Sequence, residues 1–144
     1  MEVSPVNAKR LTVLALTLIL VAGCSGGKYA EEKTLLTTVT KAMETFNGAI
    51  GSAGVPEDVA KALGSFTGAI EKVLPKMKEL NTAHPEWEDN PPKELKDTFA
   101  KFEAATGAFK SETMPKVMQF ARDNMDNAEL QDALKKFGSI ASEM

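Results

Sequence analysis

Residues 59–80 read VAKALGSFTGAIEKVLPKMKEL and carry the most regular apolar pattern of the chain. The apolar positions follow one another at intervals of 4, 3, 4, 3, 4 and 3 residues: Val59, Leu63, Phe66, Ile70, Val73, Met77 and Leu80. This spacing puts seven side chains on one face of an α-helix, as in a heptad seam. We therefore predict a helix over about residues 56–81. Pro75 should kink this helix without ending it, because Met77 and Leu80 keep the register.

A second stripe precedes this segment. Residues 28–52 carry apolar side chains at intervals of 3, 4, 3 and 4: Leu36, Val39, Met43, Phe46 and Ile50. This spacing predicts an amphipathic helix, and Pro56 with Glu57 and Asp58 suits the start of the next one.

Residues 82–92 contain three prolines and no helical period, so they predict a loop before a third helix with Leu95, Phe99, Phe102 and Phe109. The segment 111–115 predicts a break or kink, followed by a fourth segment over about residues 115–124. Asp126 with Glu129 fits a capping box that opens a last helix. The fourth and fifth segments could also form one bent helix. No strand pattern competes, so we expect an all-α, up-and-down bundle of about four helices, one of them possibly broken.

The N-terminal segment has the pattern of an export signal. Lys9 and Arg10 precede an apolar run of 12 residues, 11–22, which ends in small residues and Cys24, the single cysteine. The run is shorter than the roughly 20 residues that a membrane-spanning helix needs. Its basic flank, length and small-residue end are typical of a cleavable signal peptide.

Val21, Ala22, Gly23 and Cys24 resemble the lipobox of bacterial lipoproteins, with Val21 where Leu is usual. The resemblance covers only the first 25 residues or so. It implies cleavage between Gly23 and Cys24, a covalent lipid on Cys24 and an acylated amino terminus. Some lipoproteins carry a retaining Asp directly after the lipidated cysteine. This chain has Ser25 at that position instead, and the resemblance therefore favours the outer membrane, on the side that faces the periplasm. The alternative is an ordinary signal peptide, or a short membrane anchor, with an incidental cysteine.

These boundaries divide the chain into a signal peptide (1–23), a lipidated cysteine with a flexible tether (24–27) and a helical domain (28–144). Without residues 1–23, the chain has 121 residues with 15 basic and 19 acidic side chains, a net charge of −4. This mildly acidic balance gives no electrostatic basis for binding nucleic acid. Acyl chains on Cys24 would anchor the protein to a membrane.

Catalysis has few candidate residues. The single histidine, His84, lies in a proline-rich loop, and the single cysteine is assigned to lipid. A nucleophilic triad therefore has no plausible base, and we expect no enzymatic activity and no cofactor.

The loop 82–92 holds two weaker candidates. His84, Glu86, Glu88 and Asp89 form the chain's one cluster of possible metal ligands, but a solvated acidic loop is the favoured interpretation. Trp87 is either an exposed anchor for a partner or a cover for the open end of the bundle, and the second reading is favoured.

The sequence thus predicts a non-enzymatic envelope lipoprotein that binds another protein or helps to organise the envelope. The main alternative is a periplasmic carrier that holds a small apolar ligand or a metal ion, and an inhibitor or immunity protein is a more distant one. A cavity lined by Phe46, Phe66, Phe99 and Phe102 would favour the carrier. A packed core with an exposed apolar patch would favour the binding module.

Overall fold

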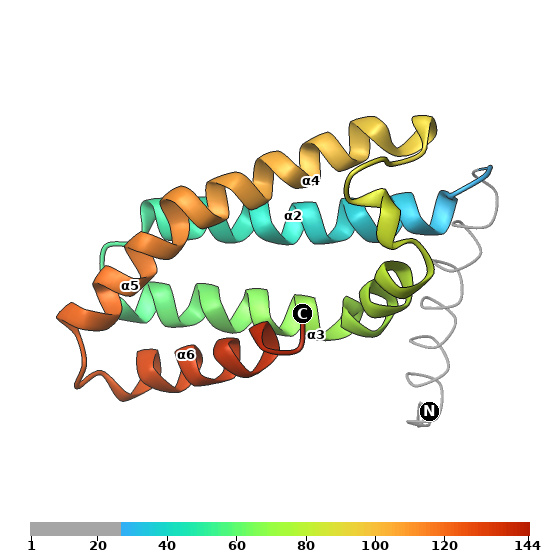
Figure 1. Cartoon of the computed structure of the whole chain (residues 1–144). Helices are drawn as coiled ribbons and strands as arrows, with labels where there is room; N and C mark the ends of the chain where they lie inside the picture. The colour runs from blue at the N-terminus through green and yellow to red at the C-terminus, as the bar shows by residue number, and fades with distance from the viewer. Residues whose placement is uncertain (1–26) are drawn as a thin grey trace, which may run out of the picture.

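The computed structural model describes residues 27–144, and within that range every regular element is helical (Figure 1). The leader and Cys24 lie outside the described residues. The elements follow in the order α2 (Ala30–Ser52), α3 (Pro56–Ala83), η1 (Pro85–Trp87), η2 (Lys93–Leu95), α4 (Lys96–Ala108), η3 (Phe109–Thr113), α5 (Met114–Asp123) and α6 (Ala128–Ala141). The predicted all-α bundle is confirmed, and no helix in this range is long and apolar enough to cross a bilayer.

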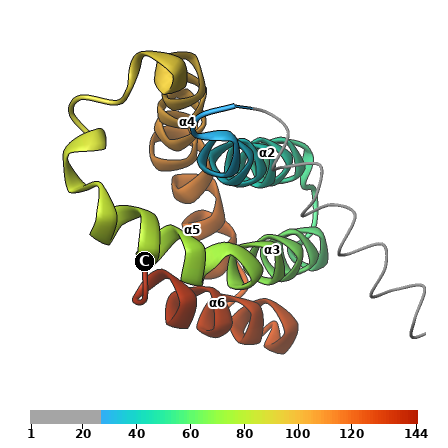
Figure 2. The same ribbon diagram turned by 90° about the vertical axis from the view of Figure 1, so that its right-hand side faces the viewer.

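The bundle is built around the antiparallel pair α2 and α3. Helix α4 packs beside α2, and α6 packs beside α3 (Figure 2). Two polar contacts, Lys116 Nζ to Gly51 O (2.8 Å) and Asn127 Nδ2 to Glu57 Oε1 (2.8 Å), place α5 and the start of α6 at the α2–α3 turn. The chain therefore alternates in direction through α2, α3, the α4–α5 rod and α6, as an up-and-down bundle does.

Aromatic rings from α2, α3, η3 and α6 fill the centre of the bundle. Phe46 of α2 stacks on Phe66 of α3 with ring centroids 4.7 Å apart, and Phe109 lies 5.9 Å from Phe46 and 5.8 Å from Phe66. Phe137 of α6 completes the group, 6.2 Å from Phe66 and 6.3 Å from Phe109. Such pairs add to the free energy already gained by burying the rings. The apolar stripes that predicted α2 and α3 are the side chains that form this core.

The break or kink predicted at residues 111–115 is not a break, but the helix is irregular there. Helices α4 and α5 form one continuous rod, joined by the π-helical turn η3, in which the Met114 N–H donates to Phe109 O. Pro115 has no N–H to donate, so an ordinary turn would leave a carbonyl without its partner at this point. The wider turn places the proline in the first turn of α5, where the missing donor is tolerated.

The predicted start of the last helix is wrong in detail. Asn127, not Asp126, caps α6: its side chain accepts a hydrogen bond from the Leu130 N–H at 3.0 Å. Residues 124–127 form a turn, so the fourth and fifth predicted segments are not one bent helix.

Asn47 ties α2 to the π turn. Its Nδ2 donates to Ala105 O at 3.2 Å, and its Oδ1 accepts from Thr113 Oγ1 at 2.7 Å. Because Thr113 is buried, Asn47→Ala leaves polar groups without partners, and we expect it to lower the free energy of unfolding by about 1–3 kcal/mol. Urea denaturation measures the change. Asn81→Ala, at an exposed helical position, should lower the free energy of unfolding by less than about 0.5 kcal/mol. Equal losses in the two variants would show that the hydrogen bonds of Asn47 do not stabilise the fold.

Candidate functional site

The loop that offered metal ligands does not assemble them. His84 Nδ1 lies 3.5 Å from Glu86 Oε1, while Glu88 and Asp89 are exposed. Across residues 27–144, no group of three or more His, Cys, Asp or Glu side chains could hold a metal ion. The loop thus pairs two of the four candidates, and the geometry gives no support to the metal-carrying alternative.

His84 instead supports Trp87. The two rings stack with centroids 3.8 Å apart and planes 9° from parallel, and Tyr29 meets Trp87 edge-on at 5.2 Å. Trp87 is only 6% exposed. It therefore covers one end of the bundle, which was the favoured reading, and it is not an exposed anchor for a partner.

The same corner joins the N-terminal tether to the bundle. Gly27 and Tyr29 both have left-handed backbone conformations, with φ of 86° and 65°, just before α2 begins. The ammonium group of Lys28 lies 4.9 Å from the centre of the Tyr29 ring, and its hydrogen bond with Tyr29 raises the pKa of Lys28. Residues 27–29 thus lead into α2 as a turn, with Tyr29 against Trp87.

An open cleft of about 680 Å³ lies beside this corner, between the C-terminal half of α3, η1 and α4. We call it the end cleft. Buried Leu36 of α2 contributes to it, and four half-buried side chains supply most of its apolar surface: Met77, Leu80, Phe99 and Phe102. Trp87 also lines it. Its volume falls in the range of small-molecule sites, which are mostly apolar with a few polar groups.

The end cleft exists because α3 extends past α6. Glu143, just after α6, pairs with Lys78 at 3.3 Å, so the last turn of α3 with Leu80 projects beyond this contact. The chain then turns through η1 and returns along α4 (Figure 1). Leu80, in the last turn of α3, and Phe99, in the first turn of α4, both line the end cleft.

Polar side chains also line the end cleft, and they are unevenly charged. Glu88 and Glu103 bring two carboxylates, and Lys110 brings one ammonium group. All three are exposed, as is Asn81, while His84 is half-buried. The cleft therefore suits a long apolar group better than an anionic one.

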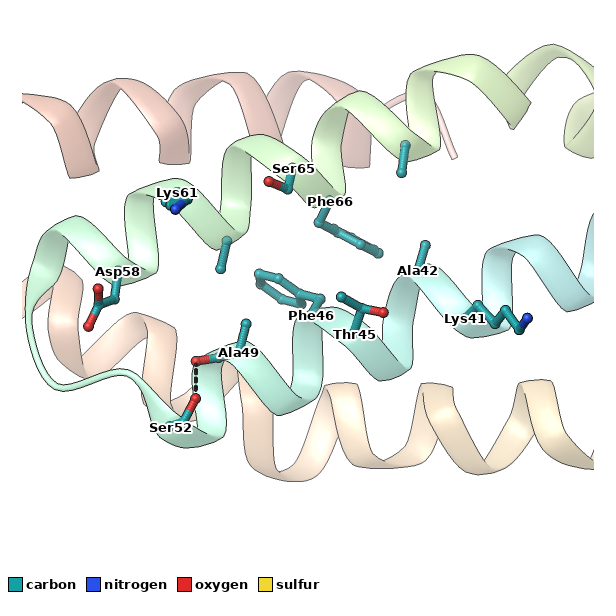
Figure 3. A pocket seen from close by; sticks show the side chains of 12 residues that line it. Lys41, Ala42, Thr45, Phe46, Ala49, Ser52, Asp58, Lys61, Ser65 and Phe66 are labelled. Atoms are coloured by element: carbon teal, nitrogen blue, oxygen red, sulfur yellow. Dashed lines mark hydrogen bonds between the residues drawn. The ribbon is translucent and has the colours of Figure 1, made fainter. Parts of the chain in front are cut away.

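A second groove, of about 610 Å³, runs between α2 and α3. Figure 3 shows Phe46 and Phe66 pointing toward one another across it, with Lys41, Lys61 and Asp58 farther along. Small residues such as Ala42, Ala49 and Ser65 make up much of the rest. Both rings are at least 95% buried, and the other apolar side chains of this groove are small, whereas the end cleft presents four long, half-buried apolar side chains: Met77, Leu80, Phe99 and Phe102.

The structure separates the four phenylalanines that would have lined one cavity in a carrier. Phe46 and Phe66 stack in the core, whereas Phe99 and Phe102 line the end cleft with Met77 and Leu80. Sequence reasoning placed Met77 and Leu80 on the seam and missed their exposure. Met77 still packs against the core, so the seam continues past Pro75.

Three large exposed apolar side chains belong to segments at the other end of the bundle. Of the four in residues 27–144, three belong to segments at the α2–α3 turn or in α5 and the turn after it: Val55 (49% exposed), Met118 (51%) and Met125 (76%). We call this group the distal surface. The two contacts that join α5 and α6 to the α2–α3 turn bring these segments together.

Comparisons of the chain with protein-family models, with curated proteins and with solved structures found no match.

Proposed function

We propose that this protein is an exported lipoprotein, anchored by acyl chains on Cys24 to the outer membrane on its periplasmic side. In this proposal the helical bundle is a non-enzymatic module that binds another envelope protein through the distal surface. The signal-like leader and the cysteine that ends it support the anchoring. The exposure of Val55, Met118 and Met125, on segments at the same end of the bundle, supports the binding role and carries the proposal.

The arrangement suits an anchored binding module. Cys24 precedes α2 by six residues, so the lipid can lie no farther than about 20 Å from the start of that helix. Helix α2 has 23 residues and is therefore roughly 35 Å long, with its N-terminus, which follows the tether in the sequence, at one end and the α2–α3 turn at the other (Figure 1). Anchoring at Cys24 would hold the distal surface away from the membrane, where a partner can reach it.

The composition of the distal surface fits an adaptable contact. Methionine is flexible and polarizable, and it is common on surfaces that bind apolar segments of other proteins. Met125 lies in the turn between α5 and α6, and Met118 lies on α5, so neither is needed to fill the core. We expect the partner to contribute an apolar segment, because the exposed atoms here are those of Val and Met side chains.

Site-specific photo-crosslinking in intact cells tests the binding role. With a photoreactive amino acid at position 118 or 125, we expect one defined crosslinked species at least about tenfold more abundant than with the probe at Lys72, an exposed position on α3. Met125→Asp should weaken the crosslink formed from position 118, since a charge would be buried against an apolar partner. Equal yields at all three positions would contradict the assignment.

The end cleft favours a second candidate function, the carriage of an apolar ligand. Its half-buried Met77, Leu80, Phe99 and Phe102 would lose contact with water when a ligand binds. The distal surface and the end cleft lie at opposite ends of the bundle, so the two functions are compatible.

A further inference from the structure

We propose that the end cleft shelters one acyl chain of the lipid on Cys24. This inference rests on the lipidation of Cys24 in the proposed function, and it names the ligand of the second candidate function. The cleft binds a long, uncharged hydrocarbon chain from the same molecule. Three features of the structure support this assignment: the lining of the cleft, its charge and its position beside the tether.

The lining suits a hydrocarbon chain. Met77 and Leu80 come from α3, Phe99 and Phe102 from α4, and buried Leu36 from α2, so three helices contribute apolar surface to the same cleft. These side chains offer no hydrogen-bonding group that a polar ligand would need. Transfer of methylene groups from water to such a surface is favourable in proportion to the apolar area that is buried.

The charged side chains of the end cleft favour an uncharged acyl chain over an anionic one. Glu88 and Glu103 outnumber Lys110 among the charged side chains that line the cleft. These charges are exposed to water, so the cleft gives the carboxylate of a free fatty acid no strong partner. The acyl chains of a lipidated cysteine are joined through ester and amide bonds, which carry no charge, and such chains meet no repulsion here.

The position favours the chain's own lipid. Cys24 precedes Gly27 by three residues, which span at most about 11 Å of extended chain. Tyr29 contacts Trp87 at 5.2 Å, and Trp87 lines the end cleft. An acyl chain on Cys24 therefore starts close to the cleft and reaches it as an intramolecular ligand, at a high effective concentration.

Binding of an acyl chain in the end cleft would weaken the attachment of the protein to the membrane. An acyl chain in the cleft is withdrawn from the bilayer, and each withdrawn chain reduces the apolar contact that anchors the protein. The cleft is open, so the chain can move between the cleft and the membrane.

Photo-crosslinking of the native lipid tests the inference. Cells are grown with a palmitate analogue that carries a diazirine near the end of its chain, the full-length lipidated protein is purified after irradiation, and its peptides are mapped by mass spectrometry. We expect crosslinks between the acyl chain on Cys24 and peptides that contain residues 77–88 or 99–110 of the same molecule. The proportion of labelled Cys24 gives the yield of lipidation independently of any crosslink.

A pair of glycine substitutions supplies the variant and its control. Gly107 lines the end cleft, and a Cβ built there meets nothing within 4 Å, so Gly107→Leu should occupy the cleft without disturbing the helices. We expect it to lower the cleft crosslinks at least about fivefold, because the new side chain competes for the same space. Gly138→Leu, at an equally open position on α6 that does not line the cleft, should leave the yield unchanged. Circular dichroism verifies that both variants keep their helices.

Each contrary outcome has a distinct meaning. Labelled Cys24 with crosslinks only to phospholipid overturns this inference and leaves the lipidation in place. Adducts of phospholipid on the cleft peptides, or crosslinked dimers, show that the chain in the cleft comes from another molecule and also overturn it. Cys24 without label overturns the lipidation itself, and with it this inference.

Discussion

Replacing Cys24 by serine is expected to abolish incorporation of fatty acid and to leave residues 1–23 attached to the chain. A thiol with a pKa near 8.5 provides some thiolate at neutral pH, whereas a serine hydroxyl provides essentially no alkoxide and is a much weaker nucleophile. Cys24 is the chain's single cysteine, so no other thiol can take its place. By the lipoprotein resemblance, cleavage follows lipidation, and the leader should therefore remain.

Metabolic labelling with a fatty-acid probe and mass spectrometry of the purified chain measure both effects. The expected change is from nearly complete labelling to background, together with retention of 23 residues. Ser25→Ala is the matched control, since it alters the neighbouring residue and keeps the thiol, and it should be lipidated and cleaved like the native chain. Fatty acid on the Cys24→Ser protein would disprove the assignment of Cys24 as the lipid-bearing residue.

Phe66→Ala is expected to lower the free energy of unfolding by about 3–5 kcal/mol, which is a large share of the 5–15 kcal/mol typical of a whole domain. Phe66 is 5% exposed and contacts rings from α2, the π turn and α6: Phe46, Phe109 and Phe137. Removing it leaves a cavity at the point where these elements meet. The surrounding helices cannot close such a cavity completely, because each is also held by its own neighbours.

Urea denaturation of the chain from Ser25 onward, followed by circular dichroism, measures this loss. Met118→Ala removes a side chain that is 51% exposed, and it should change the free energy of unfolding by less than about 0.5 kcal/mol. A loss below about 1 kcal/mol for Phe66→Ala would show that the four rings do not form a packed core.

The helices that form the core could be predicted because their signal is local and periodic. Leu36 through Ile50 and Val59 through Ile70 are spaced for one helical face, and burial of that face against another helix is the only way to remove it from water. Pro115 predicted the local backbone structure less well. A proline predicts that an ordinary helical turn fails, but the chain has two remedies, a break or a wider turn, and packing of the rod against α2 and α3 decides between them.

The candidate sites depended on contacts between distant parts of the chain. The seam that continues to Leu80 predicts burial, yet the end cleft exists because α6 ends opposite Lys78, more than sixty residues later in the chain. The acidic residues near His84 suggested a metal site, but His84 lies flat against Trp87, and across residues 27–144 no group of three or more candidate ligands could hold a metal ion. Similarly, Asp126 and Asn127 are both good capping residues, and only the contact of Asn127 with Glu57 distinguishes them.

The π turn has a consequence for chain length. Phe109, Thr113 and Val117 follow one another at intervals of four, where a regular seam would alternate three and four, so the rod contains one residue more than an α-helix needs here. Deleting Ser111 would shorten the rod by about 1.5 Å and keep the following threonine and valine facing inward. The same deletion between Leu63 and Phe66 would rotate every later side chain of α3 by about 100° and turn its apolar face outward. Deletion of one residue should therefore be tolerated at this turn and rejected in α3.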